Sequence, residues 1–204
     1  MPTRPAAASP AARTQLPRDE RRAQLIGAAA VAFARTGFAG TSMEDVAAEA
    51  GVTKLIVYRH FASKEELYRA VLERVSTDLR QTFWARMADA TGDVPGLVIR
   101  SMLEVARRDP DAVRLLFVHA RREPAFADYA AEHRSNAVAV ADAMVGPFLG
   151  DAVVGAWAAR TIVSYLENAL LVWLDEGEPE RDDEFVRLAT DGLAAMVLAW
   201  VPPA

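Results

Sequence analysis

The chain has 204 residues, of which 52% are hydrophobic and 25% are charged, a composition typical of a globular protein with a buried core. It contains no cysteine, which excludes disulfide bridges and thiolate metal sites. Its three histidines do not have the spacing of a zinc site, so we expect neither a metal nor a cofactor.

The net charge of −5 is distributed unevenly along the chain. Residues 1–75 contain 11 Lys and Arg against 8 Asp and Glu, a net charge of +3, so residues 76–204 carry −8. This asymmetry favours a basic head that approaches phosphates and an acidic body that does not. Random scatter of surface charge is the alternative explanation.

Residues 1–17 are rich in Ala, Pro, Ser and Thr, with two arginines and no acidic residue. Four prolines oppose a helix and no apolar run forms a signal-peptide core, so we expect a disordered basic arm. An organelle transit peptide is the less favoured alternative. Basic arms of this kind contact the DNA backbone or minor groove.

Helical spacing of apolar residues continues from the end of this arm. It predicts a first helix over residues 19–36, ended by Gly37. Residues 41–44 and 63–66 each have the capping-box pattern that starts a helix. Between these two starts, one short helix is expected to end at Gly51 and another to run over residues 53–60.

Two short helices joined by a glycine turn are typical of a helix-turn-helix, whose second helix lies in the major groove. We therefore expect residues 18–65 to form a DNA-binding domain, with Val52, Leu55 and Ile56 anchoring the second helix from beneath. Its outer surface and the neighbouring helix starts would contact phosphates and base edges, with Val57 against a thymine methyl. The predicted contact residues are Thr41, Thr53, Lys54, Val57, Tyr58, Arg59, His60 and Lys64. A three-helix packing unit with solvated charges is the alternative.

The remaining chain is also helical in its periodicity, and no stretch alternates as a strand does. After a long helix that begins at residue 63, helices are expected over residues 95–108, 110–122, 124–148, 151–176 and 185–201. The prediction is thus an all-α fold of about nine helices. The most apolar stretch, residues 153–174, carries Arg160, Glu167 and Asn168 near its middle, which disfavours a membrane span. The last two helices carry more apolar residues than the core of one chain needs, so they are predicted to form a dimer surface. Ordinary core packing is the alternative for each of these residues, and the two can hold on different faces of the same helix.

A ligand pocket is expected among the middle helices, where large side chains are frequent. Glu167 and Asn168 interrupt an apolar helix, and a buried polar group needs a partner on the dimer mate, the same chain or a ligand. The predicted pocket residues are Met102, Phe117, Phe126, Tyr129, Trp157, Tyr165, Glu167 and Asn168. Ordinary core packing is the alternative for each large side chain.

Residues 28–72 resemble the DNA-binding domain of the TetR family, also called TetR/AcrR-like regulators. The matching segments are residues 33–38, 41–47, 50–54, 57–61 and 63–67, in family order and at family spacing. The chain departs from the pattern at residues 55–57, where family members commonly carry a smaller residue first and Thr or Ser last. Arg59 and His60 also replace frequent choices. These departures bear on which bases are read.

The resemblance implies an all-helical homodimer whose first three helices bind DNA. It further implies that residues 66–204 form a regulatory, ligand-binding and dimerisation domain, whose last two helices build a four-helix bundle with those of the partner. A small hydrophobic effector would then release a repressor from a pseudo-palindromic operator. Such a protein would be cytoplasmic and not an enzyme, and no catalytic motif is visible in the sequence. A helical interaction module without a ligand, or less plausibly an enzyme, remains as the alternative.

Overall fold

The computed structural model describes residues 16–88 and 94–202. Over these residues it contains helices and turns but no strand, which confirms the all-α prediction. The nine α-helices described are α1 (Arg18–Gly40), α2 (Met43–Glu49), α3 (Lys54–His60), α4 (Lys64–Ala88), α5 (Val94–Arg108), α6 (Pro110–Arg114), α7 (Ala127–Leu149), α8 (Ala152–Glu176) and α9 (Asp182–Trp200). Apart from residues 16 and 17, the predicted basic arm lies outside the described residues.

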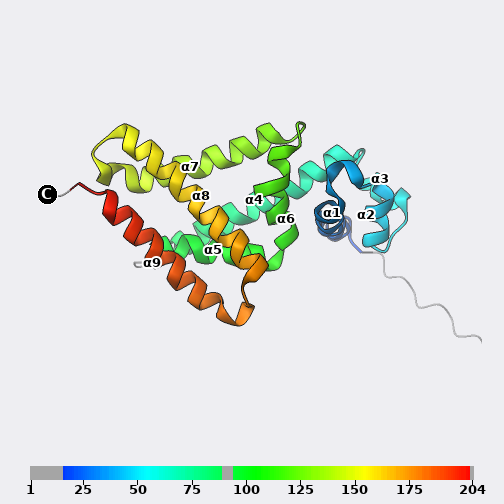
Figure 1. Ribbon diagram of the computed structural model, residues 1–204. Coiled ribbons are helices and arrows are strands. Elements are labelled where there is room, and N and C mark those ends of the chain that lie inside the picture. Colours follow the sequence, from blue (N-terminus) through cyan, green and yellow to red (C-terminus); the bar gives the residue numbers. More distant parts are fainter. Residues whose placement is uncertain (1–15, 89–93, 203–204) are drawn as a thin grey trace, which may run out of the picture.

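The helices divide into a small head and a larger body (Figure 1). Helices α1, α2 and α3 lie together at one end, and α4 runs from this head into the body formed by α5 to α9. Helix α9 lies on the side of the body farthest from α2 and α3. No helix in the described part of the chain is long and apolar enough to cross a membrane.

The core of the head forms where four amphipathic helices bury their apolar stripes against one another. The first half of α4 packs on α1, so the head's core continues into the long helix. The buried side chains include Leu25, Ala29, Phe33, Val46, Ala47, Val57, Phe61, Leu67, Tyr68 and Val71. Burying a large apolar side chain contributes roughly 1.5–3 kcal/mol, so this core is sufficient to hold the two short helices that could not form alone.

Helix α2 starts one residue later than the sequence pattern suggested. Ser42, not Thr41, is the N-cap: its Oγ accepts a hydrogen bond from the Asp45 amide at 3.2 Å, and the Asp45 carboxylate accepts from the Ser42 amide at 2.8 Å. The second predicted box forms in part. Ser63 Oγ accepts from the Glu66 amide at 3.1 Å, whereas the Glu66 carboxylate accepts from the amide of Ala62.

A cluster of aromatic rings joins the head to the body. Tyr68 of α4 lies 4.9 Å from Phe33 and 5.2 Å from Phe38 of α1, and 4.4 Å from Phe126 at the start of α7, measured between ring centroids. Offset and edge-on ring pairs of this kind are stabilising. The prediction that Phe126 lines a ligand pocket is therefore wrong, because its buried ring packs against Phe38 and Tyr68.

The segment predicted as one helix over residues 110–122 is three short pieces. Helix α6 passes into a π-helix, Leu115–His119, and then into a 3-10 turn, Ala120–Arg122. Asp109 caps α6 by accepting from the Ala112 amide at 3.2 Å, and its carboxylate also pairs with Arg74 of α4. This pair fixes the start of α6 against the long helix that carries the head.

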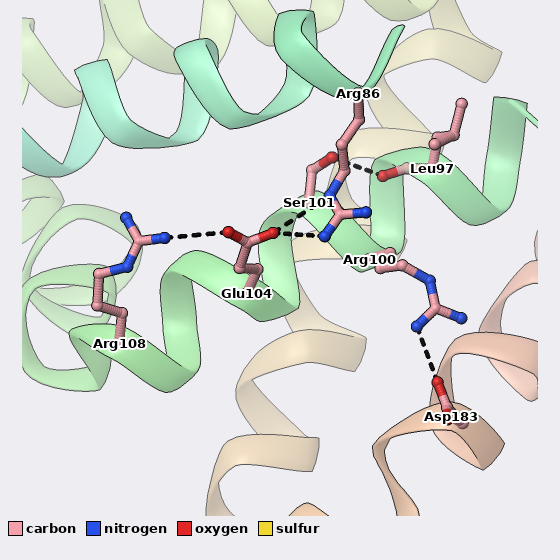
Figure 2. A network of polar contacts seen from close by, with 7 residues as sticks. All are labelled: Arg86, Leu97, Arg100, Ser101, Glu104, Arg108 and Asp183. Atoms are coloured by element: carbon pink, nitrogen blue, oxygen red, sulfur yellow. Dashed lines mark hydrogen bonds and ion pairs between the residues drawn. The ribbon is translucent and has the colours of Figure 1, made fainter. Parts of the chain in front are cut away.

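Polar contacts also join α4, α5 and α9 (Figure 2). Arg86 of α4 donates from Nε to Glu104 Oε2 of α5 at 3.2 Å, and Arg108 pairs with the other oxygen of Glu104 at 3.0 Å. Arg100 of α5 pairs with Asp183 of α9 at 2.8 Å. Because these groups are partly exposed, each pair contributes little free energy, and their main effect is to fix how the three helices sit on one another.

Candidate nucleic-acid interface

The turn between α2 and α3 is short and tightly hydrogen bonded. The Ala50 amide donates to Val46 O and the Val52 amide donates to Ala47 O, both at 2.9 Å. Gly51 has φ of 65°, a left-handed conformation that favours glycine. Gln24 of α1 donates to Ala50 O at 3.0 Å, which ties the turn to the first helix. The two short helices therefore hold a fixed angle, as a helix-turn-helix requires.

Helix α3 buries the face that carries Val57, and Phe61, which caps the helix at its C-terminal end, is also buried. Val57 is 0% exposed, so the prediction that it contacts DNA is wrong. Leu55, predicted to anchor the helix from beneath, is 68% exposed. The reason is geometric: two residues correspond to about 200° of helix rotation, so Leu55 points away from the core when Val57 points into it. Ile56 lies between them and is half-buried.

The exposed face of α3 carries most of the remaining predicted contact residues. Thr53, Lys54, Tyr58 and Arg59 are exposed, and His60 is half-buried. Arg59 makes no ion pair with any residue in the described ranges. Its guanidinium is thus available to a phosphate or to a guanine edge.

Two of the predicted contacts have structural roles inside the head. Thr41 is buried, and its hydroxyl lies 2.7 Å from Gly37 O at the kink in α1. The prediction that Thr41 contacts phosphate is therefore wrong, because a DNA backbone cannot reach it. Lys64 donates from Nζ to Phe38 O at 2.7 Å and lies over the Phe38 ring, so its charge helps to hold α1 to α4.

Two neighbouring side chains on the exposed face of the head hold the ammonium group of Lys54 in place. Lys54 pairs with Glu44 of α2, and its Nζ lies 5.5 Å from the centroid of the Tyr58 ring. The hydrogen bond from Lys54 lowers the pKa of Glu44 and raises the pKa of Lys54. A phosphate that binds Lys54 therefore competes with Glu44 for the ammonium group.

Sequence reasoning missed a basic group on α1. Burial lowers the pKa of His60, and the positive charges of Arg18, Arg21, Arg22 and Arg59 lower it further. His60 is therefore neutral at pH 7, and the α1 arginines lie close enough to the recognition helix to extend its positive surface. The signals of this group in the sequence were the net charge of +3 over residues 1–75 and the spacing of Arg18, Arg21 and Arg22, which places them on one helix face.

The predicted pocket residues do not gather at one site. Trp157 is 51% exposed and contacts Trp200 at 4.7 Å between centroids, and Asn168 is exposed, so neither lines an internal pocket. Tyr129 is half-buried against the core. Tyr165 donates from its hydroxyl to Ala189 O at 3.1 Å, and burial raises its pKa.

Glu167 is buried, as its position in an apolar helix suggested, and its partners lie in the same chain. Its carboxylate pairs with Arg121 at 2.6 Å and with Arg134 of α7. The neighbouring His133 stacks near Phe117 at 6.1 Å, and burial, with the charges of nearby arginines, lowers the pKa of His133 to about 4. This cluster connects α7, α8 and the turn after the π-helix.

A small apolar cavity lies between α5, α8 and α9. Its volume is about 10 Å³, about the room that one water molecule needs. The lining residues are Ile99, Met102, Leu166, Ala169, Leu170, Phe185 and Ala189. Of the predicted pocket residues, only Met102 belongs to this lining.

These features together define a class of protein. The head has three helices, and a rigid turn joins α2 to α3. The exposed face of α3 carries an ammonium group, an aromatic ring and a guanidinium. Together with the helical body, these are the parts of a helix-turn-helix DNA-binding protein. Residues 25–71 match the family model described as bacterial regulatory proteins, tetR family.

A curated relative that aligns along most of the chain shows the family. The transcriptional activator FasR of Mycolicibacterium smegmatis is 31% identical over 179 residues, which cover 84% of this chain and 80% of FasR. The repressor SCO4008 of Streptomyces coelicolor is 33% identical over 47% of each chain. This chain therefore belongs to the TetR family and is a DNA-binding transcriptional regulator.

Solved structures have the same fold. A TetR-like regulator from Rhodococcus sp. RHA1 superposes with a TM-score of 0.77 at 22% identity, covering 91% of this chain and 99% of the other. The multidrug binding protein EbrR, solved with malachite green, has a TM-score of 0.65 at 26% identity, covering 90% and 99%. The likeness to both extends through the head and the body.

The orientation of α3 predicts effects of different size on stability for substitutions at residues 55 and 57. Val57→Ala removes buried methyl groups and is expected to lower the free energy of unfolding by about 1–3 kcal/mol. Leu55→Ala removes exposed atoms and is expected to change it by less than about 0.5 kcal/mol. Urea unfolding at one fixed protein concentration measures both. A larger loss for Leu55→Ala than for Val57→Ala would reverse the assigned faces.

Proposed function

We propose that this regulator is a homodimeric repressor that binds a pseudo-palindromic operator and is released by a small hydrophobic effector. The exposed face of α3 carries the proposal, since it is the surface of the head where unburied cationic and aromatic side chains lie on a helix that fits the major groove. In this proposal residues 18–65 are the DNA-binding domain and residues 66–204 the regulatory domain. The protein would act in the cytoplasm and have no enzymatic activity.

The proposed contacts divide by chemistry. Arg59 is suited to the O6 and N7 atoms of guanine, and Tyr58 and Thr53 to phosphate oxygens. Lys54 would exchange Glu44 for phosphate, and His60, being neutral, would donate a single hydrogen bond. Lys64 already donates to Phe38 O, so its part would be limited to the positive potential at the start of α4.

Loss of Lys54 or Tyr58 is expected to weaken operator binding without unfolding the protein. With DNA selected from a random duplex pool by the wild-type protein, Lys54→Ala and Tyr58→Ala should each raise Kd about tenfold. Lys54→Ala should also reduce the dependence of Kd on salt, because it removes a phosphate contact. Electrophoretic mobility shifts at several salt concentrations measure both effects.

Arg181→Ala is the matched control for Lys54→Ala. Arg181 is an exposed cation paired with a carboxylate, Glu184, as Lys54 is paired with Glu44, but it lies between α8 and α9. Its loss should leave Kd unchanged. If Lys54→Ala and Tyr58→Ala both bind the operator as tightly as the wild type, α3 is not the helix that contacts the bases.

An apolar surface on α8 and α9 supports dimerisation through these helices. Leu198 of α9 is 72% exposed, and Trp157 of α8 and Trp200 of α9 meet edge to face. The other exposed apolar residues of α8 and α9 include Val153, Val154, Val172 and Leu188. Exposed apolar surface of this extent is typical of an interaction site. A second copy of the chain fits best, because a two-fold axis here leaves α2 and α3 uncovered.

A charge placed in this surface should separate the dimer. Leu198→Asp is expected to sediment as a folded monomer at micromolar concentration, whereas the wild type sediments as a dimer. Val31→Asp, at an exposed apolar position on α1, is the control and should remain dimeric. A dimeric Leu198→Asp protein would place the interface elsewhere.

The effector proposal is supported by the cavity between α5, α8 and α9 and by the relative EbrR, solved with malachite green and with imidazole. Known pockets hold roughly 300–1,000 Å³, so an effector must enlarge the cavity by moving α5 away from α8 and α9. Glu104 of α5 is paired with Arg86 of α4 (Figure 2), and α4 carries the head. Because α4 also packs along α5, movement of α5 would displace α4 and with it the head.

Filling the cavity should block the response to effectors. We expect hydrophobic compounds that raise the melting temperature of the wild type to lower its operator affinity and to derepress a reporter. Ala169→Leu, which adds volume inside the cavity, should reduce both effects, and Ala131→Leu, the same change at an exposed position on α7, should not. Compounds that bind without changing operator affinity, or that increase repression, would contradict the proposal.

A further inference from the structure

The first turn of α3 presents a large apolar side chain to solvent. Leu55 is 68% exposed, and it lies between Thr53 and Lys54 on one side and Tyr58 and Arg59 on the other. Tyr58 and Arg59 follow it at i+3 and i+4, so the three side chains share one face of the helix. Leu55 is the apolar member of the surface that faces the DNA in the proposed function.

Packing within the head does not explain this leucine. The inner face of α3 is filled by Val57 and Phe61, both buried, and Ile56 covers the edge of that contact. An alkyl side chain that projects into water contributes little to folding. A contact made only in the complex accounts for its size and position.

The chemistry of the major groove limits what Leu55 can recognise. Its side chain has no hydrogen-bond donor or acceptor, so it cannot bind phosphates or read the polar base edges. The apolar group exposed in the major groove is the C5 methyl of thymine. The N-terminal residues of a recognition helix are the ones that reach base edges, and Leu55 is the second residue of α3.

We propose that Leu55 is a specificity-determining residue that reads thymine through its C5 methyl group, with the half-buried Ile56 extending the apolar contact. The inference rests on the proposed function, since it assumes that α3 enters the major groove. Tyr58, Arg59 and Lys54 then fix the position of the helix on phosphates and polar edges, and Leu55 selects a thymine between them.

The test removes only the methyl group. A duplex of about 30 base pairs, selected from a random pool by the full-length wild-type protein, is remade with single deoxyuridine in place of each thymidine. A single substitution, in one half-site only, is expected to raise Kd about fourfold, the factor for one methyl group leaving an apolar contact. Changing both half-sites together should give about fifteenfold.

Variants assign the effect to Leu55. For Leu55→Ala, the increase in Kd caused by deoxyuridine at that position should fall below twofold. The binding of this variant should remain salt-dependent, and its circular dichroism spectrum should match that of the wild type. Leu55→Gln keeps the length of the side chain and adds polar groups, so it should select a different base at the same position. Val31→Ala, which truncates an exposed apolar residue on α1, should keep the full penalty.

Two results would overturn the inference. Sequence-specific binding with no deoxyuridine penalty above twofold would show that no methyl is read, and a penalty retained in Leu55→Ala would assign the methyl to another residue. Failure of the proposed function looks different, because the wild type would then select no sequence from the pool at all.

Discussion

The buried face of α3 is the constraint on which the reading surface depends. Val57 of α3 and Phe61, which caps the helix at its C-terminal end, are buried in the core of the head, and a helix of seven residues held at these two points has no room to rotate. Gly51 sets the direction in which the helix leaves the turn. The side chains offered to DNA are therefore a consequence of packing beneath them, and any change in that packing would turn a different set outward.

Sequence patterns predicted the fold well because they repeat over long helices. The apolar stripe of α1 and the long apolar helix that became α8 each supply many turns of consistent spacing. The site was harder, since Leu55, Ile56 and Val57 are three adjacent apolar residues in a two-turn helix. Period alone cannot say which of them points inward, and tertiary packing decided. Thr41 and Ser42 posed the same problem, because both are good caps and only one can occupy the N-cap.

The pocket could not be predicted from residue size. Most helices of the body contact at least two neighbours, so large apolar side chains are needed on several of their faces. Phe126 packs where the body meets the head, and Trp157 lies on the outer surface of the body. Glu167 was recognisable because a carboxylate in an apolar helix needs a partner. That partner proved to be a pair of arginines in the same chain, and such buried ion pairs fix geometry more than they add stability.

The length of α4 has a mechanical consequence. Its 25 residues form one continuous rod of about 37 Å, with the head attached near one end and Arg86 held by the body near the other. If α4 tilts by about 5° about its end near Arg86, Lys64 at the other end moves by roughly 3 Å. That displacement is close to the spacing of adjacent base pairs, so in the proposed complex a small rotation of the body would be enough to move α3 out of register with the bases that it faces.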